Sequence, residues 1–295
     1  MRRGSGIGLT CAALVAASVA GAEPVAEFVG RFVWTEPDDR FGGISGFDFM
    51  PGGTGFVAVS DSAAVFTGQM IRGAHGAVIS VETDPAYVPL SSHGKPLHEP
   101  SDDAEGVAIA PDGKLLISYE TQDRVVMYGQ GGRFWMQEFW PEYFEGMQIN
   151  GGPEALAMDD DGALYTMPER PYSFSSQIPV FLFRNNQWSH PFTLRRNGSW
   201  APVGADFGPD GRLYILERDY WGLVGFMSRV RRITILGDQV AADEVILETS
   251  AGQHDNLEGL AVWRDTQGDI RLTMVSDNNF VPFRSTEIVD YRIAE

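Results

Sequence analysis

The chain has 295 residues, of which 43% are hydrophobic and 34 are glycines, a composition typical of a globular protein with many tight turns. Its 40 acidic residues against 22 basic ones give a formal net charge of −18 at neutral pH, which excludes nucleic acid and anionic membrane surfaces as partners and favours cations. The one cysteine, Cys11, excludes an internal disulfide framework.

The first 22 residues differ in character from the rest of the chain. Arg2 and Arg3 precede an apolar stretch over residues 7–20, and a small-x-small sequence follows at residues 20–22. The apolar stretch is shorter than the ~20 residues of a membrane span, so the pattern predicts a secretory signal peptide, exported by the general or the twin-arginine route. We expect residues 23–295 to form one periplasmic or secreted domain. Cleavage removes two arginines and no acid, which changes the formal charge from −18 to −20.

A pattern recurs five times after the N-terminal segment: a polar or acidic residue, a Gly or Ala, a short apolar run, a turn, and a second apolar run that ends near another acid. The first position of the pattern, which is polar in four copies and a valine in the other, anchors the alignment, and adjacent anchors are separated by 60, 49, 49 and 55 residues. The five anchors are Ser45, Glu105, Glu154, Val203 and Glu258. Periods of this length are typical of propellers and solenoids.

Each copy is built from strands, which favours a propeller. In the second copy an apolar run at residues 107–109 is followed by a Pro-Asp-Gly turn at 111–113 and a second run at 115–119. Two further runs follow, at 124–128 and 134–139. Four strands per copy is the content of a propeller blade.

The fifth copy contains three apolar runs, the last at residues 287–293, so it is one strand short of a complete blade. An unassigned run at 27–34 precedes the first copy. We therefore expect an all-β fold, a β-propeller of five four-stranded blades in which the N-terminal strand completes the last blade and removes an open edge. The alternative is a sixth blade within residues 83–103, a stretch with four prolines and no alternating apolar pattern.

The acids of the repeat are predicted to meet at one mouth of the central channel. The first strand of a blade lines the channel and the second returns antiparallel to it, so the start of one and the end of the other lie on the same face. The expected pairs are Ser45 with Asp61, Glu105 with Glu120, Glu154 with Glu169, Asp206 or Val203 with Glu217, and Glu258 with Asp277.

Crowded carboxylates repel one another, and a divalent cation is the simplest compensation. Ca²⁺ is the first choice, because the candidate ligands are all oxygen donors. These candidates are Glu105, Glu154, Glu258, Asp277 and Asn278. The alternative is a structural role, in which the acids accept hydrogen bonds from blade loops or pair with Arg124, Arg170 and Arg218, and Asn278 and Asn279 form turns.

Several short sequences together resemble the bacterial phytase-like family that is described as having esterase-like activity. They are Gly42-Gly-Ile-Ser-Gly46, Glu-Gly-Val-Ala at 105–108, Asn150-Gly-Gly-Pro-Glu154, Leu213-Tyr-Ile-Leu-Glu-Arg218, Glu-Gly-Leu-Ala at 258–261 and Val275-Ser-Asp-Asn-Asn-Phe280. The resemblance implies an exported β-propeller of the group that includes calcium-dependent phytases and other propeller hydrolases. The sequence has no match to the lysine- and arginine-rich phosphate site of the true propeller phytases.

The sequence therefore supports two functions from different classes. One is a metal-assisted hydrolase of phosphate or carboxylic esters, with Glu154, Glu258 or His254 as general acid or base. Its substrate would contact Ser45, Asp61, Glu120, Glu169, Arg170, Glu217, Arg218 and Asn279. The other is a non-catalytic propeller, whose mouth binds a small ligand or a protein. In both cases we expect a monomer without a membrane span. A serine hydrolase is disfavoured, since the chain lacks a Gly-x-Ser-x-Gly sequence.

Overall fold

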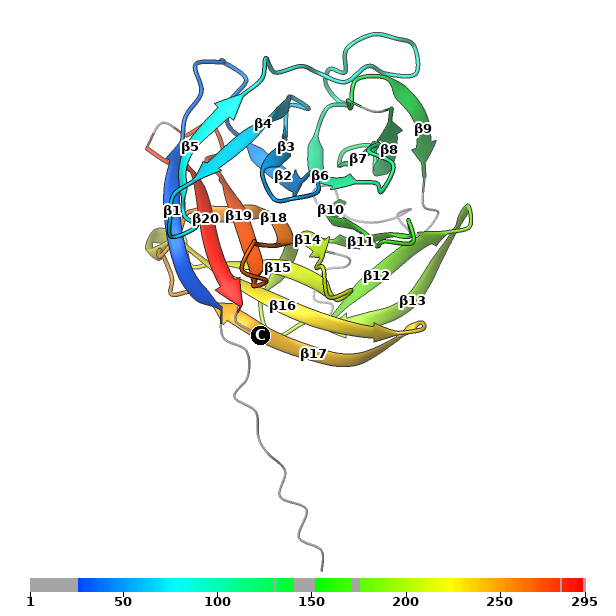
Figure 1. The fold of residues 1–295 in the computed structure, drawn as a ribbon. Helices are drawn as coiled ribbons and strands as arrows, with labels where there is room; N and C mark the ends of the chain where they lie inside the picture. Colours follow the sequence, from blue (N-terminus) through cyan, green and yellow to red (C-terminus); the bar gives the residue numbers. More distant parts are fainter. Residues whose placement is uncertain (1–25, 130, 141–151, 171–175, 282, 294–295) are drawn as a thin grey trace, which may run out of the picture.

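Five four-stranded antiparallel sheets are arranged around a central axis in the computed structural model (Figure 1). The structure describes residues 26–129, 131–140, 152–170, 176–281 and 283–293, so the predicted signal peptide lies outside the described residues. The prediction of an all-β propeller with five blades is confirmed.

The strands follow the chain blade by blade. Blade 1 consists of β2 (Ile44–Phe49), β3 (Gly55–Ser60), β4 (Val65–Arg72) and β5 (Val78–Thr83). Blade 2 consists of β6 (Ala104–Ile109), β7 (Leu115–Tyr119), β8 (Arg124–Tyr128) and β9 (Trp135–Phe139). Blade 3 consists of β10 (Pro153–Met158), β11 (Leu164–Pro168), β12 (Gln177–Arg184) and β13 (Gln187–Arg195). Blade 4 consists of β14 (Ala201–Phe207), β15 (Leu213–Tyr220), β16 (Phe226–Leu236) and β17 (Gln239–Glu248). Blade 5 consists of β18 (Asn256–Arg264), β19 (Ile270–Asp277), β20 (Thr286–Ile293) and β1 (Glu27–Trp34).

The N-terminal strand closes the ring, as the strand count predicts. β1 pairs antiparallel with β20 along its length, from Glu27 opposite Arg292 to Trp34 opposite Thr286. Trp34 is 1% exposed and packs edge-on against Phe56 and Phe66 of blade 1, with ring centroids 5.3 and 6.2 Å apart. Burial of one such side chain stabilises the fold by about 1.5–3 kcal/mol, so β1 joins the last blade to the first by packing as well as by hydrogen bonds.

The alternative of a sixth blade is wrong. Residues 84–103 form a loop that contains only isolated bridges, between Val65 and Tyr87 and between Leu90 and Pro96. This loop lies over blades 1 and 2, and Tyr87 and Leu97 pack against their shared apolar core.

The innermost strands β2, β6, β10, β14 and β18 contact one another around the axis (Figure 1). Glycine after the anchor makes this close approach possible. A Cβ atom on Gly106 would lie 2.6 Å from the Glu154 carbonyl oxygen, and one on Gly204 would lie 2.2 Å from that of Glu258. Neighbouring inner strands therefore meet backbone to backbone, which accounts for the Glu-Gly sequence of the repeat.

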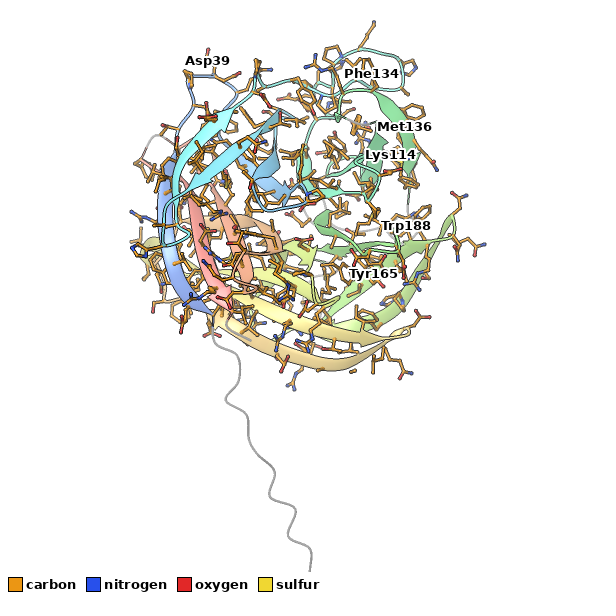
Figure 2. The ribbon with its side chains drawn as sticks, in the orientation of Figure 1. Asp39, Lys114, Phe134, Met136, Tyr165 and Trp188 are labelled. Carbon is orange, nitrogen blue, oxygen red and sulfur yellow. The ribbon has the colours of Figure 1, made fainter. Side chains whose placement is uncertain are left out.

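Apolar side chains fill the spaces between adjacent blades, and the outer strands face solvent. Phe134 and Met136, at the outer edge of blade 2, are 64% and 46% exposed (Figure 2). Among the described residues, no helix has the length and apolarity that a bilayer span requires.

Candidate functional site

A β-bulge occurs at the same place on the inner strand of every blade. In β6, Ala104 pairs with Tyr119 and Gly106 with Ser118, which leaves Glu105 as the extra residue. The register shifts of the other four inner strands leave out the other anchors in the same way, namely Ser45, Glu154, Val203 and Glu258. A bulge bends the strand and redirects the side chain of its extra residue. The anchor residue of each copy is therefore the extra residue of a β-bulge, and the bulges turn these five side chains toward the axis.

A second set of side chains follows from the same registers. On the second strand of each blade, one residue follows the partner of the residue just before the bulge. These five residues are Asp61, Glu120, Glu169, Arg218 and Asp277. In blade 4, Glu217 is still opposite Pro202 in the ladder, so Arg218 takes the place that an acid has in the other blades.

The expected position of Glu217 at the mouth is therefore wrong by one residue. Because neighbouring strand residues point to opposite faces, Glu217 is directed into blade 4, where it is fully buried. Its carboxylate accepts a hydrogen bond of 2.9 Å from Arg231 Nη1 and another from Arg229 Nε. Its function in the structure is to neutralise two buried guanidinium groups.

The two sets of side chains surround a cavity of about 530 Å³ at one mouth of the channel. Among the described residues, eight carboxylates and three guanidinium groups line it, together with a few polar and aromatic side chains. Of the predicted mouth residues it contains Ser45, Asp61, Glu105, Glu120, Glu154, Glu169, Arg170, Arg218, Glu258, Asp277 and Asn279. It also contains Asp103, Tyr220, Phe226, Asn256 and Arg284. Beneath this cavity the channel narrows to a space of about 10 Å³, which Val203 helps to line, so the mouth is a closed-ended pocket.

One part of the cavity concentrates carboxylates. Oxygen atoms of Asp103, Glu105 and Glu120 lie within 4.8 Å of one another. Burial, followed by repulsion from Glu154, Glu258 and Asp103, raises the pKa of Glu105 well above its ordinary value. Burial also raises the pKa of Glu120. Three oxygen donors that repel one another fit a hard divalent cation, and no Cys or His is needed among the ligands.

Asp103 was not predicted from the sequence, because it precedes β6 and has no equivalent in the other copies. Its position depends on the loop before β6. The guanidinium of Arg124 holds this loop by donating hydrogen bonds of 2.6 Å to the Ser101 carbonyl oxygen and 3.1 Å to that of Gln122. The Asp103 carboxylate itself accepts a 2.8 Å hydrogen bond from the Thr121 hydroxyl. Arg124 therefore supports the carboxylate cluster through the backbone and does not pair with its acids.

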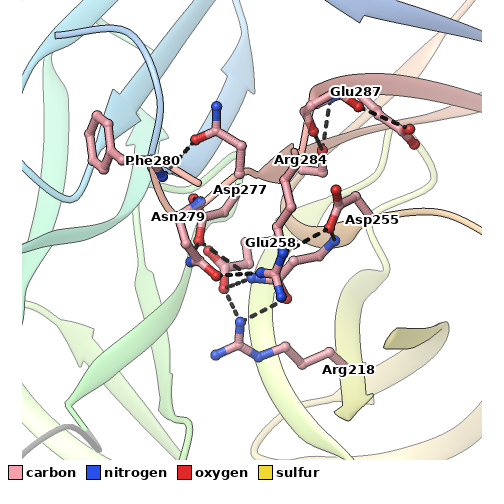
Figure 3. Close-up of polar contacts among 12 residues, drawn as sticks. Arg218, Asp255, Glu258, Asp277, Asn279, Phe280, Arg284 and Glu287 are labelled. Carbon is pink, nitrogen blue, oxygen red and sulfur yellow. Dashed lines mark hydrogen bonds and ion pairs between the residues drawn. The ribbon is translucent and has the colours of Figure 1, made fainter. Parts of the chain in front are cut away.

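Arginine neutralises the other part of the cavity. Arg218 forms an ion pair with Glu258 (Figure 3). It forms a second ion pair of 3.2 Å with Glu169 and donates a 2.9 Å hydrogen bond to Asn256 Oδ1. Burial alone would lower the pKa of Arg218, but the carboxylates of Glu258, Glu169 and Glu154 raise it above its ordinary value. Burial raises the pKa of Glu258 to about 8, although Arg218 acts in the opposite direction.

The structure therefore separates Glu258 from the carboxylate cluster that suits a cation. Asp277 is held in a similar way, since its carboxylate accepts hydrogen bonds from the backbone and side-chain amides of Asn279. Asn279 in turn accepts a 2.6 Å hydrogen bond from Arg284 (Figure 3). Arg170 lies at the exposed edge of the cavity, 3.5 Å from Glu169.

Glu154 lies in the same cavity as Arg218 but forms no ion pair with any of the described residues. It is 7% exposed, and among the described residues no side chain or backbone group donates a hydrogen bond to its carboxyl group. Burial, followed by repulsion from Glu169, raises its pKa well above the ordinary value. A carboxyl group in this environment can hold a proton near neutral pH, as a general acid or base requires.

Three other candidate positions lie away from the cavity. His254 is buried against blade 5, where its Nε2 lies 2.8 Å from the Tyr291 hydroxyl and its ring stacks on Phe28. Asn278 Oδ1 accepts hydrogen bonds from the backbone N–H groups of Gly43 and Phe280, so it forms a turn and is not among the lining residues.

Asp206 lies in a separate cavity of about 550 Å³ at the other end of the channel, which it shares with Asp48. Its Oδ2 accepts a 2.6 Å hydrogen bond from the Val262 backbone. The expectation that Asp206 or Val203 pairs with Glu217 at the mouth is therefore wrong. Asp206 lies opposite Tyr214, near the end of β14 away from the mouth, whereas Val203 is the extra residue of the bulge and Glu217 points into the blade.

Residues 39–280 match the family model described as "Esterase-like activity of phytase", of the phytase-like family. No curated protein sequence matches the chain. Among solved structures, the PQQ-bound aldose sugar dehydrogenase of Streptomyces coelicolor is 12% identical with a TM-score of 0.47, over 92% of this chain and 100% of the other. A virginiamycin B lyase of Staphylococcus aureus is 9% identical with a TM-score of 0.44, over 90% and 99%.

The hydrazine synthase of Kuenenia stuttgartiensis is 16% identical with a TM-score of 0.44, and the match covers 84% of this chain and 60% of that one. At these identities and TM-scores, none of the three structures bears on the activity of this chain.

Proposed function

The chain belongs to the phytase-like family, and on this premise we propose that it is a hydrolase that binds a divalent cation at the channel mouth and cleaves phosphate or carboxylic esters. The observation that carries the proposal is the division of one cavity into two parts. A carboxylate cluster of Asp103, Glu105 and Glu120 lies in the same 530 Å³ pocket as Arg170 and Arg218. Such a pocket offers one place for a cation and another for the anionic oxygens of a substrate.

Asp103, Glu105 and Glu120 would hold the cation, and Ca²⁺ suits their flexible carboxylate geometry best. When bound, the cation supplies Lewis-acid polarisation of the ester or phosphoryl oxygen and a more acidic water. A positive ion here would also offset the acidic field that otherwise repels an anionic substrate from a chain of formal charge −18.

The arginines have different parts in this proposal. Arg218 is 21% exposed and is fixed between Glu169 and Glu258, so it provides a positioned positive charge on the cavity wall. Arg170 is 63% exposed and its Nε lies 3.5 Å from Glu169, so its two terminal nitrogens would bind two oxygens of a substrate in a bidentate manner. Both would orient the ester relative to the carboxylates.

Glu154 is the residue that we assign to proton transfer. It lies in the cavity, has no ion-pair partner among the described residues, and has a raised pKa because of burial and its acidic neighbours. In its unprotonated form it would accept a proton from the attacking water and return it to the leaving group. Its bulge position directs the carboxyl group to the axis.

We further propose that residues 1–22 are removed on export and that residues 23–295 act as a monomer in the periplasm or outside the cell. Such a location would expose the mouth to Ca²⁺ without competition from cytoplasmic polyanions.

Metal analysis and a panel of phosphate and carboxylic esters, assayed with and without chelator, test the proposal. We expect Ca²⁺ to raise the melting temperature by mass action and chelator to abolish hydrolysis. Asp103→Asn should remove the Ca²⁺ response. Asp112→Asn is the matched control, because Asp112 is exposed and pairs only with Lys114 on a surface turn. Glu154→Gln should keep the Ca²⁺ response and lose turnover.

A wild-type protein that is indifferent to Ca²⁺ and to chelator, with no bound metal and no hydrolysis, would refute this function. The acids would then be structural, and the non-catalytic ligand-binding propeller would be the better description.

A further inference from the structure

Apolar side chains are exposed beside the acidic cavity. Tyr220, Trp221, Leu223 and Val224 are 60%, 57%, 108% and 60% exposed, and they form the tip of the hairpin between β15 and β16. We call these four residues, together with Phe226, the apolar rim. Contiguous exposed apolar groups are uncommon on a soluble chain and mark a binding surface.

The hairpin tip is held in place by hydrogen bonds. Trp221 donates its backbone N–H to the Gly225 carbonyl oxygen over 2.9 Å, and its indole N–H to Asp219 Oδ2 over 2.8 Å. The backbone N–H of Gly252 donates to the Phe226 carbonyl oxygen over 2.8 Å. A Cβ atom on Gly252 would lie 2.6 Å from the Val224 carbonyl oxygen, so the adjoining loop supports the tip closely. The apolar side chains are therefore presented to solvent by a fixed backbone.

The rim is continuous with the cavity. Tyr220 and Phe226 line the cavity itself, and their rings are 4.8 Å apart between centroids. The guanidinium of Arg284, another lining residue, lies 5.2 Å from the centroid of the Phe226 ring. The same guanidinium binds Asn279 (Figure 3). The wall of the pocket is thus charged at Arg284 and aromatic at Phe226 and Tyr220. The exposed apolar side chains of the hairpin tip continue from these two rings.

We propose that the substrate is amphiphilic, with its ester group in the acidic cavity and an aryl or alkyl group on the apolar rim. This inference rests on the proposed hydrolase function, whose substrate class it specifies. A polyanion would face the carboxylates that line the described part of the cavity and would gain nothing from the rim. A singly anionic or neutral ester with an apolar group has one part that matches the cation and arginines, and another that removes Trp221 and Leu223 from water.

Binding of non-hydrolysable phosphonates in CaCl₂ tests this without requiring turnover. Calorimetry on the intact protein would compare methyl-, propyl-, hexyl- and phenylphosphonate. We expect affinity to increase along the alkyl series by roughly twofold to fourfold for each methylene that contacts the rim. The double variant Trp221→Ser with Leu223→Ser should bind all four ligands about as weakly as wild type binds methylphosphonate.

Leu236→Ser is the matched control. Leu236 is 69% exposed and lies at the opposite end of β16, so the same loss of apolar surface there should leave the series unchanged. The melting-temperature response to Ca²⁺ should be equal in all variants.

The two proposals fail in different ways. An affinity that rises with chain length in a protein that hydrolyses no ester supports the rim and overturns the hydrolase function. Hydrolysis together with a flat phosphonate series overturns the rim. A rising series that the double variant retains also overturns it, because the apolar group would then bind elsewhere. Co-sedimentation with phosphatidylcholine vesicles that depends on Leu223, with a flat phosphonate series, would identify the rim as a lipid contact and overturn the proposal.

Discussion

Replacement of Glu217 by Gln tests whether blade 4 depends on a buried charge cluster. The side chain is 0% exposed, and its two oxygens accept hydrogen bonds from Arg231 and Arg229, which are 2% and 4% exposed. Gln keeps the shape and one acceptor, but it places an NH₂ group against a guanidinium donor and removes the charge that neutralises both arginines. Arg231 retains Asp243 as a partner, whereas the described partner of Arg229, besides Glu217, is the ring of Trp200 at 4.6 Å.

Breaking a buried pair on one side costs about 3–5 kcal/mol, because an uncompensated charge stays buried. For a domain of this size, that corresponds to a decrease of roughly 6–20 °C in melting temperature. The assay is urea and thermal unfolding followed by circular dichroism. Glu244→Gln is the control, since Glu244 pairs with Arg232 in the same blade but is 37% exposed and should cost no more than about 1 kcal/mol. Equal destabilisation by the two substitutions would refute the reasoning.

Four further predictions concern other parts of the molecule. Glu154→Gln should increase the free energy of unfolding in chelator by roughly 1–3 kcal/mol at pH 7, because burial and acidic neighbours raise the pKa of Glu154, and the folded protein must either bury its charge or take up a proton; a decrease would contradict the raised pKa. Burial lowers the pKa of His254 from 6.5 to about 4. The imidazole therefore binds a proton more readily in the unfolded chain than in the folded protein. Stability should therefore be full above pH 6.5 and decline by roughly 1–2 kcal/mol toward pH 4, and His254→Gln should remove that decline in urea titrations. Gly204→Ala should lower the unfolding free energy by about 1–3 kcal/mol, since its Cβ atom would meet a carbonyl oxygen of β18 at 2.2 Å; unchanged denaturant midpoints would argue against this contact. Deletion of residues 23–34, which include β1, should abolish a single cooperative thermal transition, and a variant that melts like the intact protein would disprove closure by packing.

The arrangement of strands could be predicted from the sequence because its determinants are local or additive. Turn residues such as Pro111 and Gly113 and short apolar runs define each strand pair, and their recurrence defines the blade. The closing strand followed from a count, since one copy is a strand short and one strand is unassigned. The same repeat predicted most of the acids that line the mouth, because antiparallel geometry relates the start of one strand to the end of the next.

The direction of individual side chains required the tertiary structure. In a strand, a shift of one residue exchanges the two faces, and each inner strand contains a bulge whose position the apolar pattern does not reveal. For this reason Arg218 occupies the place expected for Glu217, which instead lies inside the blade.

Residues on loops are the second class that the sequence left undetermined. Asp103 joins the carboxylate cluster through a loop that Arg124 supports, and His254 packs beside Tyr291, away from the mouth. Neither position follows a periodic pattern, because loop conformation depends on contacts with residues distant in sequence. The sequence by itself thus determined the five-bladed ring and the gathering of acids at one mouth. Only the tertiary structure decided which of these acids are neutralised by arginine and which remain available to a cation, since that depends on side-chain direction and on loop placement.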